Sequence, residues 1–182
     1  MRISMRLATI FVLFLPAMLR ADVSSGPAVG AEIKALKVEA VTGDKAGQEL
    51  DYAAERGDQP TIYVFVHAAK FDRPAGRFLK KLDDAVKAHN GKAAIVAVWL
   101  TDDKDSAKTR LTAIQNSLQL GATSFAVYPS LKDLPDGWGL NTDAHLTAVV
   151  AAVQKVTANF AYVSVNDTVV REVAAELSKT VK

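Results

Sequence analysis

The chain of 182 residues contains no cysteine. Disulfide bonds, thiolate nucleophiles and cysteine-bound metal ions are excluded by this absence, because each of them requires a cysteine sulfur. The folded chain must therefore be held together by its core. Apolar residues make up 49% of the sequence, and a chain of this length can bury enough of them to form one globular domain.

An excess of charge of one sign is also missing. The chain has 22 basic and 20 acidic residues, which gives a net charge of +2 at pH 7. Arg2, Arg6 and Arg20 lie in the first 21 residues, which contain no acidic residue, so residues 22–182 have 19 basic and 20 acidic side chains. Because a surface for nucleic acid needs clustered lysine and arginine, this near-neutral chain argues against a nucleic-acid partner.

Long apolar runs are absent except near the N-terminus. Residues 7–19 form a run of about 13 residues, shorter than the roughly 20 that span a bilayer. Arg2 and Arg6 precede this run and small residues follow it, in the order typical of a secretory signal peptide. We expect a signal peptide over residues 1–21, with an uncleaved membrane anchor as the alternative. A flexible lead-in over residues 22–30 and one domain over residues 31–182 would follow, in a protein that is secreted or periplasmic and leaves the membrane after cleavage.

Residues 61–66, with the sequence TIYVFV, are β-branched or aromatic and show no polar alternation. This pattern is typical of a strand that is buried on both faces, so we predict that the strand is central. Apolar residues within 78–86 then recur at helical spacing, and Asp72 and Pro74 suit the start of that helix. Residues 93–100 are a second buried strand, which a helical crossover would place parallel to the first.

The remaining elements are predicted from apolar spacing and turn residues. The neighbouring acids Asp83 and Asp84 are predicted to lie on a solvated helix face. The other predicted elements are a strand near residues 33–41, a short helix over 50–56, a helix that opens at Asp102 and Asp103 and ends by Gly121, a strand over 123–128, an irregular stretch over 129–142, a hairpin of 146–153 with 155–163, and a last helix capped by Asn166 or Asp167.

Two short segments resemble a known family. Residues 26–30 (GPAVG) precede the first predicted strand, and residues 57–65 (GDQPTIYVF) lead into the central one. Both resemble the opening of the redoxin and peroxiredoxin-like branch of the thioredoxin-like superfamily, and the order of the predicted elements is similar to the connectivity of that fold. The resemblance implies an α/β thioredoxin-like fold with a central mixed β-sheet flanked by helices.

The resemblance also shows what this chain lacks. In that family a Cys-x-x-Cys pair or a lone peroxidatic cysteine follows the central strand, where this chain has residues 70–73 (KFDR). A cis-proline usually precedes the hairpin strand, where this chain has residues 144–147 (AHLT). Lysine and arginine cannot replace a thiolate. No catalytic residue of the family is therefore carried over, and we expect no thiol oxidoreductase or peroxidase activity.

The turn after the central strand is nevertheless a candidate ligand or partner surface. Lys70, Phe71, Asp72 and Arg73 would lie at a helix N-terminus, where backbone amides favour anions. Arg73 could bind a small anion or a peptide carboxylate through two hydrogen bonds. The alternative is that Asp72 only caps the helix and that the two basic side chains are solvated.

Two further residues are candidates for the same surface. Trp138 lies in the middle of the irregular stretch and is either an exposed contact for a partner or folded back over the sheet edge. His145 would approach His67, because the ends of the central strand and the hairpin strand are neighbours in this fold. With Asp72 or Asp143, these histidines could bind zinc or copper; isolated polar histidines are the alternative.

Three functions stay open at this point. The leading hypothesis is an exported, redox-inactive binding or scaffold module for a protein or peptide partner, without a cofactor. A metal-binding protein that uses His67 and His145 is the second, and an enzyme with non-thiol acid and base groups is the third. Phosphate-binding glycine-rich loops and the Gly-x-Ser-x-Gly and His-Glu-x-x-His motifs are absent from the sequence, which therefore indicates no particular reaction.

Overall fold

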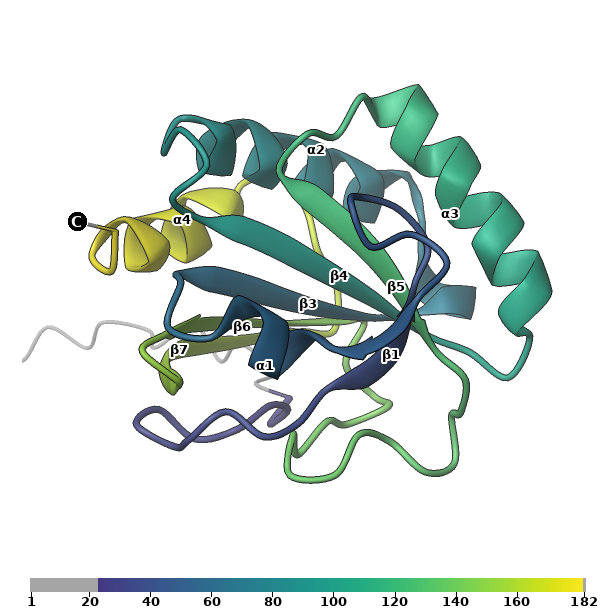
Figure 1. Cartoon of the computed structure of the whole chain (residues 1–182), viewed down its shortest axis with the longest axis horizontal. Helices are drawn as coiled ribbons and strands as arrows, with labels where there is room; N and C mark the ends of the chain where they lie inside the picture. The colour runs from purple at the N-terminus through teal and green to yellow at the C-terminus, as the bar shows by residue number, and fades with distance from the viewer. Residues whose placement is uncertain (1–22, 182) are drawn as a thin grey trace, which may run out of the picture.

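The computed structural model describes residues 23–181 (Figure 1). The predicted signal peptide over residues 1–21 lies outside the described residues. Within residues 23–181, no helix is both long and apolar enough to cross a membrane. The elements follow in the order β1 (Lys37–Ala40), β2 (Glu49–Asp51), α1 (Tyr52–Arg56), β3 (Thr61–His67), the 3-10 helix η1 (Ala68–Lys70), α2 (Arg73–Lys87), β4 (Ala94–Leu100), α3 (Lys104–Leu118), β5 (Thr123–Tyr128), β6 (Leu146–Ala152), β7 (Lys155–Tyr162) and α4 (Val170–Ser178).

The strands of the described chain form one mixed sheet in the order β2-β1-β5-β4-β3-β6-β7. β3, β4 and β5 run parallel to one another. β6 runs antiparallel to β3, and β7 runs antiparallel to β6. The predicted parallel pair of buried strands and the predicted hairpin are therefore both confirmed.

β3 lies inside the sheet, between β4 and β6, as predicted. Ile62, Val64 and Val66 belong to the core on one face of the sheet, and Tyr63 and Phe65 belong to the core on the other face. All five side chains are at most 2% exposed. Because neither face of this strand meets solvent, apolar residues are needed at successive positions, which explains the unbroken TIYVFV run.

The two faces of the sheet are covered by different elements (Figure 1). α2, α3 and α4 lie on one face, where Phe78 of α2 and Leu111 of α3 join the larger core. α1 and the irregular loop over residues 129–142 cover the opposite face, where Tyr52 and Trp138 belong to the second core. Trp138 therefore lies on the opposite face of the sheet from α2, α3 and α4.

Helix caps correct two details of the prediction. The predicted helix over residues 50–56 begins later, because Asp51 ends β2 and caps α1 with its side chain. Neither Asn166 nor Asp167 caps α4. Asn166 Oδ1 instead accepts a hydrogen bond from the Thr168 amide at 2.9 Å, which forms a turn before the helix starts. The predicted cap is therefore wrong, because the Asn166 side chain stabilises the turn and not the helix.

Residues 23–30, which were predicted to be a flexible lead-in, make several contacts with the sheet. Ser25 is 3% exposed, and its hydroxyl lies 2.6 Å from the Thr147 hydroxyl on β6. The Asn159 amide on β7 donates to the Ser25 carbonyl at 2.8 Å. Gly30 donates its amide hydrogen to a β7 carbonyl, also at 2.8 Å. These contacts cover part of an edge strand whose backbone would otherwise be exposed.

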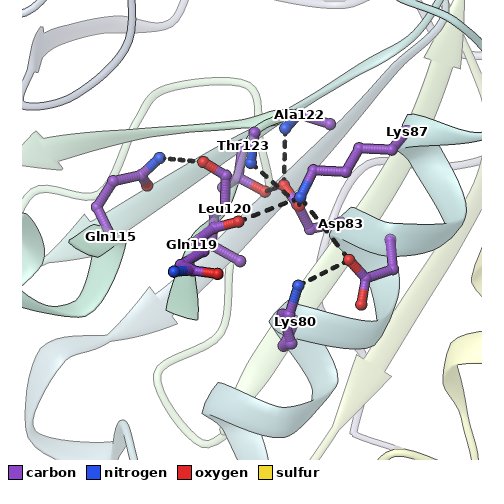
Figure 2. A network of polar contacts seen from close by, with 10 residues as sticks. Lys80, Asp83, Lys87, Gln115, Gln119, Leu120, Ala122 and Thr123 are labelled. Atoms are coloured by element: carbon purple, nitrogen blue, oxygen red, sulfur yellow. Dashed lines mark hydrogen bonds and ion pairs between the residues drawn. The ribbon is translucent and has the colours of Figure 1, made fainter. Parts of the chain in front are cut away.

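The prediction that Asp83 lies on a solvated helix face is wrong, because this residue of α2 is fully buried. Figure 2 shows the contacts of its carboxylate. Its Oδ1 accepts hydrogen bonds from the Ala122 amide and the Thr123 hydroxyl, both at 2.8 Å. Its Oδ2 accepts one from the Gly121 amide at 3.1 Å and pairs with Lys87 Nζ at 2.7 Å. Burial opposes ionisation, but these hydrogen bonds outweigh it and hold the pKa of Asp83 below its ordinary value. The carboxylate therefore fixes the connection between α3 and β5 onto α2.

Candidate binding surface

The turn after β3 and the loop before β6 meet at one end of the sheet, where β3 ends and β6 begins. Because β6 runs antiparallel to β3 with Leu146 opposite Val66, the residues that follow β3 lie beside those that precede β6. η1 and Asp72 connect β3 to α2 on one side of this end. His145 stands immediately before β6 on the other side. The fold thus gathers most of the predicted site residues around the N-terminus of α2.

Asp72 caps α2, as predicted, and also faces His145. Its Oδ1 accepts a hydrogen bond from the Ala75 amide at 2.9 Å. His145 Nε2 lies 3.7 Å from the same oxygen and is buried without a hydrogen-bond partner among the described residues. The His145 side chain is 14% exposed and that of Asp72 is 50% exposed. Asp72 therefore links the start of α2 to the loop before β6.

Replacing Asp72 by alanine is expected to lower the free energy of unfolding by about 1 kcal/mol, because the cap hydrogen bond to Ala75 is lost. Urea denaturation measures this change. Asp72→Asn keeps an oxygen acceptor at the cap and should recover most of the loss. An alanine variant as stable as the wild type would show that the cap does not stabilise α2.

Lys70 is not simply solvated. Its Nζ donates to the carbonyl of Thr142 at 2.6 Å and to that of Asp143 at 3.3 Å. Both carbonyls belong to the loop before β6, so the ammonium group joins η1 to that loop at this end of the sheet. At the position where the resemblance would place a reactive thiol, this chain thus has a lysine with a structural contact.

Phe71 is half-buried at the start of α2. Its ring centroid lies 5.1 Å from that of Trp99 on β4. Arg110 of α3 donates to the Phe71 carbonyl at 3.1 Å, and its guanidinium lies 5.0 Å from the Trp99 ring and 5.9 Å from the Phe71 ring, within the range of cation–π contacts. Sequence analysis missed Arg110, because only the packing of α3 beside α2 brings it to this site.

Trp138 does not belong to this surface, so the prediction of an exposed contact is wrong. The side chain is 1% exposed and packs on the opposite face of the sheet. Its ring centroid lies 5.1 Å from Tyr63 and 4.9 Å from Phe65, and its indole nitrogen donates to the Ala35 carbonyl at 3.2 Å. The alternative, in which Trp138 folds back over the sheet edge, is correct in that the side chain is buried against the sheet, but Trp138 packs on the central strand β3 and not at an edge.

His67 and His145 do not form a metal site with a third protein ligand. His67 Nδ1 accepts a hydrogen bond from the Ala69 amide at 3.3 Å. Burial, followed by the charge of Lys70, lowers the pKa of His67, against an opposing effect of Asp102, so the imidazole is neutral at pH 7 and is a competent ligand. Within residues 23–181, however, no three histidine, aspartate or glutamate side chains are placed to hold one metal ion.

A groove of about 700 Å³ lies next to the turn, between α2 and α3. Arg73 was predicted to be part of the site, whereas Arg77 and Arg110 were not. Arg77 could have been recognised, because it follows Arg73 by one helical turn and must lie on the same face of the helix. The residues that line the groove are Phe71, Asp72, Arg73, Gly76, Arg77, Arg110, Ile114, Ser117 and Leu118.

A second hollow, at the β1–β2 edge, differs from this groove in its charge balance. Glu39 lies there in ion pairs with Lys104 and Lys108, and hydrogen bonds from these two lysines lower the pKa of Glu39. The charges at that edge therefore neutralise one another. Among the ion pairs of residues 23–181, none involves an arginine of the α2–α3 groove, which makes this groove the better candidate for a ligand.

Comparison with known proteins identifies the fold. No protein-family model and no curated protein matches the sequence. The structure is similar to that of a DsbF homologue from Corynebacterium diphtheriae, with a TM-score of 0.61 and 14% identity over 91% of this chain and 98% of that one. A secreted thiol-disulfide isomerase from Corynebacterium glutamicum gives 0.61 and 12% over 93% and 98%. Peroxidoxin BcpB from Mycobacterium tuberculosis gives 0.59 and 13% over 84% and 97%. The predicted α/β fold, a central mixed sheet flanked by helices, is confirmed.

Proposed function

We propose that this chain, which has the thioredoxin-like fold but no cysteine, is an exported and redox-inactive protein that binds a protein or peptide partner. One observation carries the proposal. Residues 70–73 replace the family's cysteines, and they form an ordered surface beside an open groove. Lys70 and Asp72 join this surface to the loop before β6, while Arg73 is exposed at the groove. The fold thus keeps an accessible site without the sulfur chemistry.

Acid–base catalysis has less support than binding at this groove. A non-thiol enzyme would need an acid or base that is free to exchange a proton with its substrate. Asp72 is the one carboxylate in the lining, and its Oδ1 is engaged by the cap of α2. The other charged lining residues are arginines, whose guanidinium groups stay protonated in proteins.

Export has support from the N-terminal sequence and from fold neighbours, one of which is a secreted thiol-disulfide isomerase. Small residues follow the apolar run, so that cleavage could occur after Ala21 or after Ser25, and the contacts of Ser25 favour the first position. Its hydroxyl bonds Thr147 and the Asn141 amide, and cleavage after Ser25 would remove that residue from the mature protein. Cleavage after Ala21 would leave these contacts intact.

The lack of cysteine allows a site-specific test of the binding role. A single cysteine introduced by Ser117→Cys, within the groove lining, can carry a maleimide photocrosslinker at one defined position. Lys132→Cys is the matched control, because Lys132 is exposed in the loop over the other face of the sheet. We expect the groove position, and not the control position, to crosslink a partner from the exported fraction. That partner, once purified, should bind the wild-type protein directly.

Two results would contradict the proposal. Equal crosslinking from Ser117→Cys and Lys132→Cys would mean that the groove is not the binding surface. Insulin reduction or hydrogen peroxide consumption by the wild-type protein above the buffer rate would mean that it is not redox-inactive, since both reactions begin with attack by a thiolate.

A further inference from the structure

The charge of the α2–α3 groove is not balanced from within. Arg73, Arg77 and Arg110 line it and are exposed, whereas Asp72 is the one carboxylate in the lining. No described carboxylate forms an ion pair with any of these arginines. Asp167 lies within electrostatic reach of Arg77, but its ion pair is with Lys81, which is the larger cause of its lowered pKa. Arg110 uses one hydrogen bond on the Phe71 carbonyl. The groove therefore presents a positive charge, with guanidinium donors available for an anionic ligand.

The floor of the groove is apolar. Phe71, Ile114 and Leu118 line it, and each of them is only half-buried. The Phe71 ring packs against Trp99, at 5.1 Å between ring centroids, which supports it from the side of the sheet. Apolar side chains that stay partly exposed beside unpaired cations suit a ligand that carries both an apolar group and negative charge.

The arrangement of the arginines indicates how many charges that ligand carries. Arg73 and Arg77 lie one turn apart on α2, which places their Cβ atoms roughly 5–6 Å from each other. Arg110 lies on α3, on the opposite side of the groove. A fatty acid has one carboxylate and could neutralise only one of these positions. An extended peptide rises about 3.3 Å per residue, so a short segment can present several carboxylates together with an apolar side chain.

We propose that the α2–α3 groove binds an acidic peptide segment in which a large apolar side chain lies between carboxylates. The apolar side chain would pack on Phe71 and Leu118, while the flanking carboxylates would pair with Arg77 and Arg110. This inference rests on the binding role proposed above and names the chemical class of the partner.

Gly76 lets a ligand approach the backbone of α2 closely. It lies within α2 in the floor of the groove, where glycine destabilises a helix relative to alanine. Packing does not require the glycine, because an added Cβ would lie 3.8 Å from the Phe71 ring and 4.0 Å from Leu118, which is ordinary contact. The added methyl group would project toward Phe71 and Leu118, which line the groove, and would make the groove shallower there.

Fluorescence anisotropy with labelled synthetic peptides tests the proposal. We expect the peptide EEFLEE to bind the full chain, with an affinity that falls as salt is added, and the peptides QQFLQQ and EEGSEE to bind at least about tenfold more weakly, a difference of about 1.4 kcal/mol. The double variant Arg77→Glu/Arg110→Glu should also lose at least about tenfold. Lys132→Glu makes a charge change on the other face and should shift the affinity less than about twofold.

Gly76→Ala separates binding from folding. We expect this variant to melt roughly 2–4 °C higher than the wild type, because alanine favours the helix, and yet to bind EEFLEE at least about threefold more weakly. A variant that is more stable and binds equally well would overturn the close approach of the ligand to α2.

The inference and the proposed function fail in different ways. If the Ser117 position crosslinks a partner but EEFLEE binds no better than QQFLQQ, the acidic class of ligand is wrong and the binding role stands. If EEFLEE binds equally well to the wild type and to the double arginine variant, the groove is not its site, and the inference is overturned. If the Ser117 position crosslinks no partner and EEFLEE does not bind, both are wrong.

Discussion

Asp83→Ala is expected to lower the free energy of unfolding by about 3 kcal/mol, measured by urea denaturation. The substitution leaves the buried hydroxyl of Thr123 and the amides of Gly121 and Ala122 without the acceptor that they have now. Each buried donor that loses its partner costs about 1–3 kcal/mol, and the costs are not additive. Lys87 is 38% exposed, so its ammonium can return to water and contributes less to the loss.

Asp84→Ala is the matched control for this prediction. Asp84 is the next residue on α2, and its side chain is 53% exposed in an ion pair with Lys80 at 2.8 Å. Removing it changes the net charge by the same amount, but the loss should stay within about 0.5 kcal/mol. Similar losses for Asp83→Ala and Asp84→Ala would show that charge, and not the buried network, is the source of the effect.

Asp83→Asn should not restore the network. Both carboxylate oxygens of Asp83 accept hydrogen bonds from donors (Figure 2), so either orientation of an amide places its nitrogen against at least one donor. The cost of this variant should also depend on pH. Because the pKa of Asp83 is lowered from its ordinary value of 3.8, the ionised group stabilises the fold above that value. Its contribution is lost as the pH falls through the lowered pKa, so the difference between wild type and Asp83→Asn should shrink in acid.

Regular elements could be predicted because their signals are local. The bounds of β5 are those read from the sequence, residues 123–128, and the hairpin strands differ from prediction by at most one residue. Apolar runs and turn residues carry this information without reference to the rest of the chain. The burial of Asp83 has no such signal, since its partners Gly121, Ala122 and Thr123 follow it by about 40 residues.

The part of the candidate site that could be predicted is the part formed by one continuous segment, residues 70–73. Asp72 was expected to cap α2 from its position before Pro74, and it does so. Arg110 was not expected, because it lies 39 residues from Phe71 and reaches it only through the packing of α3. The contact of Lys70 with Thr142 likewise joins two segments that only the sheet brings together. A groove between two helices is a property of their packing and has no pattern of its own in the sequence.

Trp138→Ala is expected to lower the free energy of unfolding by about 3–5 kcal/mol, because it removes a buried aromatic side chain and leaves a cavity. Trp138 packs against Tyr63 and Phe65 and anchors the loop over residues 129–142 to the sheet. Trp138→Phe keeps an aromatic ring and loses the hydrogen bond to Ala35, so it should cost about 1–2 kcal/mol. Urea denaturation followed by far-UV circular dichroism measures both variants without relying on tryptophan fluorescence.

The same variants test whether Trp138 takes any part in binding. Trp138 and the α2–α3 groove lie on opposite faces of the sheet, and the changes at Trp138 remove no group that lines the groove. Folded Trp138→Phe should therefore bind EEFLEE within about twofold of the wild type, although it is less stable. In the ring contacts and hydrogen bonds of residues 23–181, Trp138 does not touch any residue of the groove lining. A loss of affinity near that of Arg77→Glu/Arg110→Glu would therefore mean that the loop is coupled to the groove through the sheet.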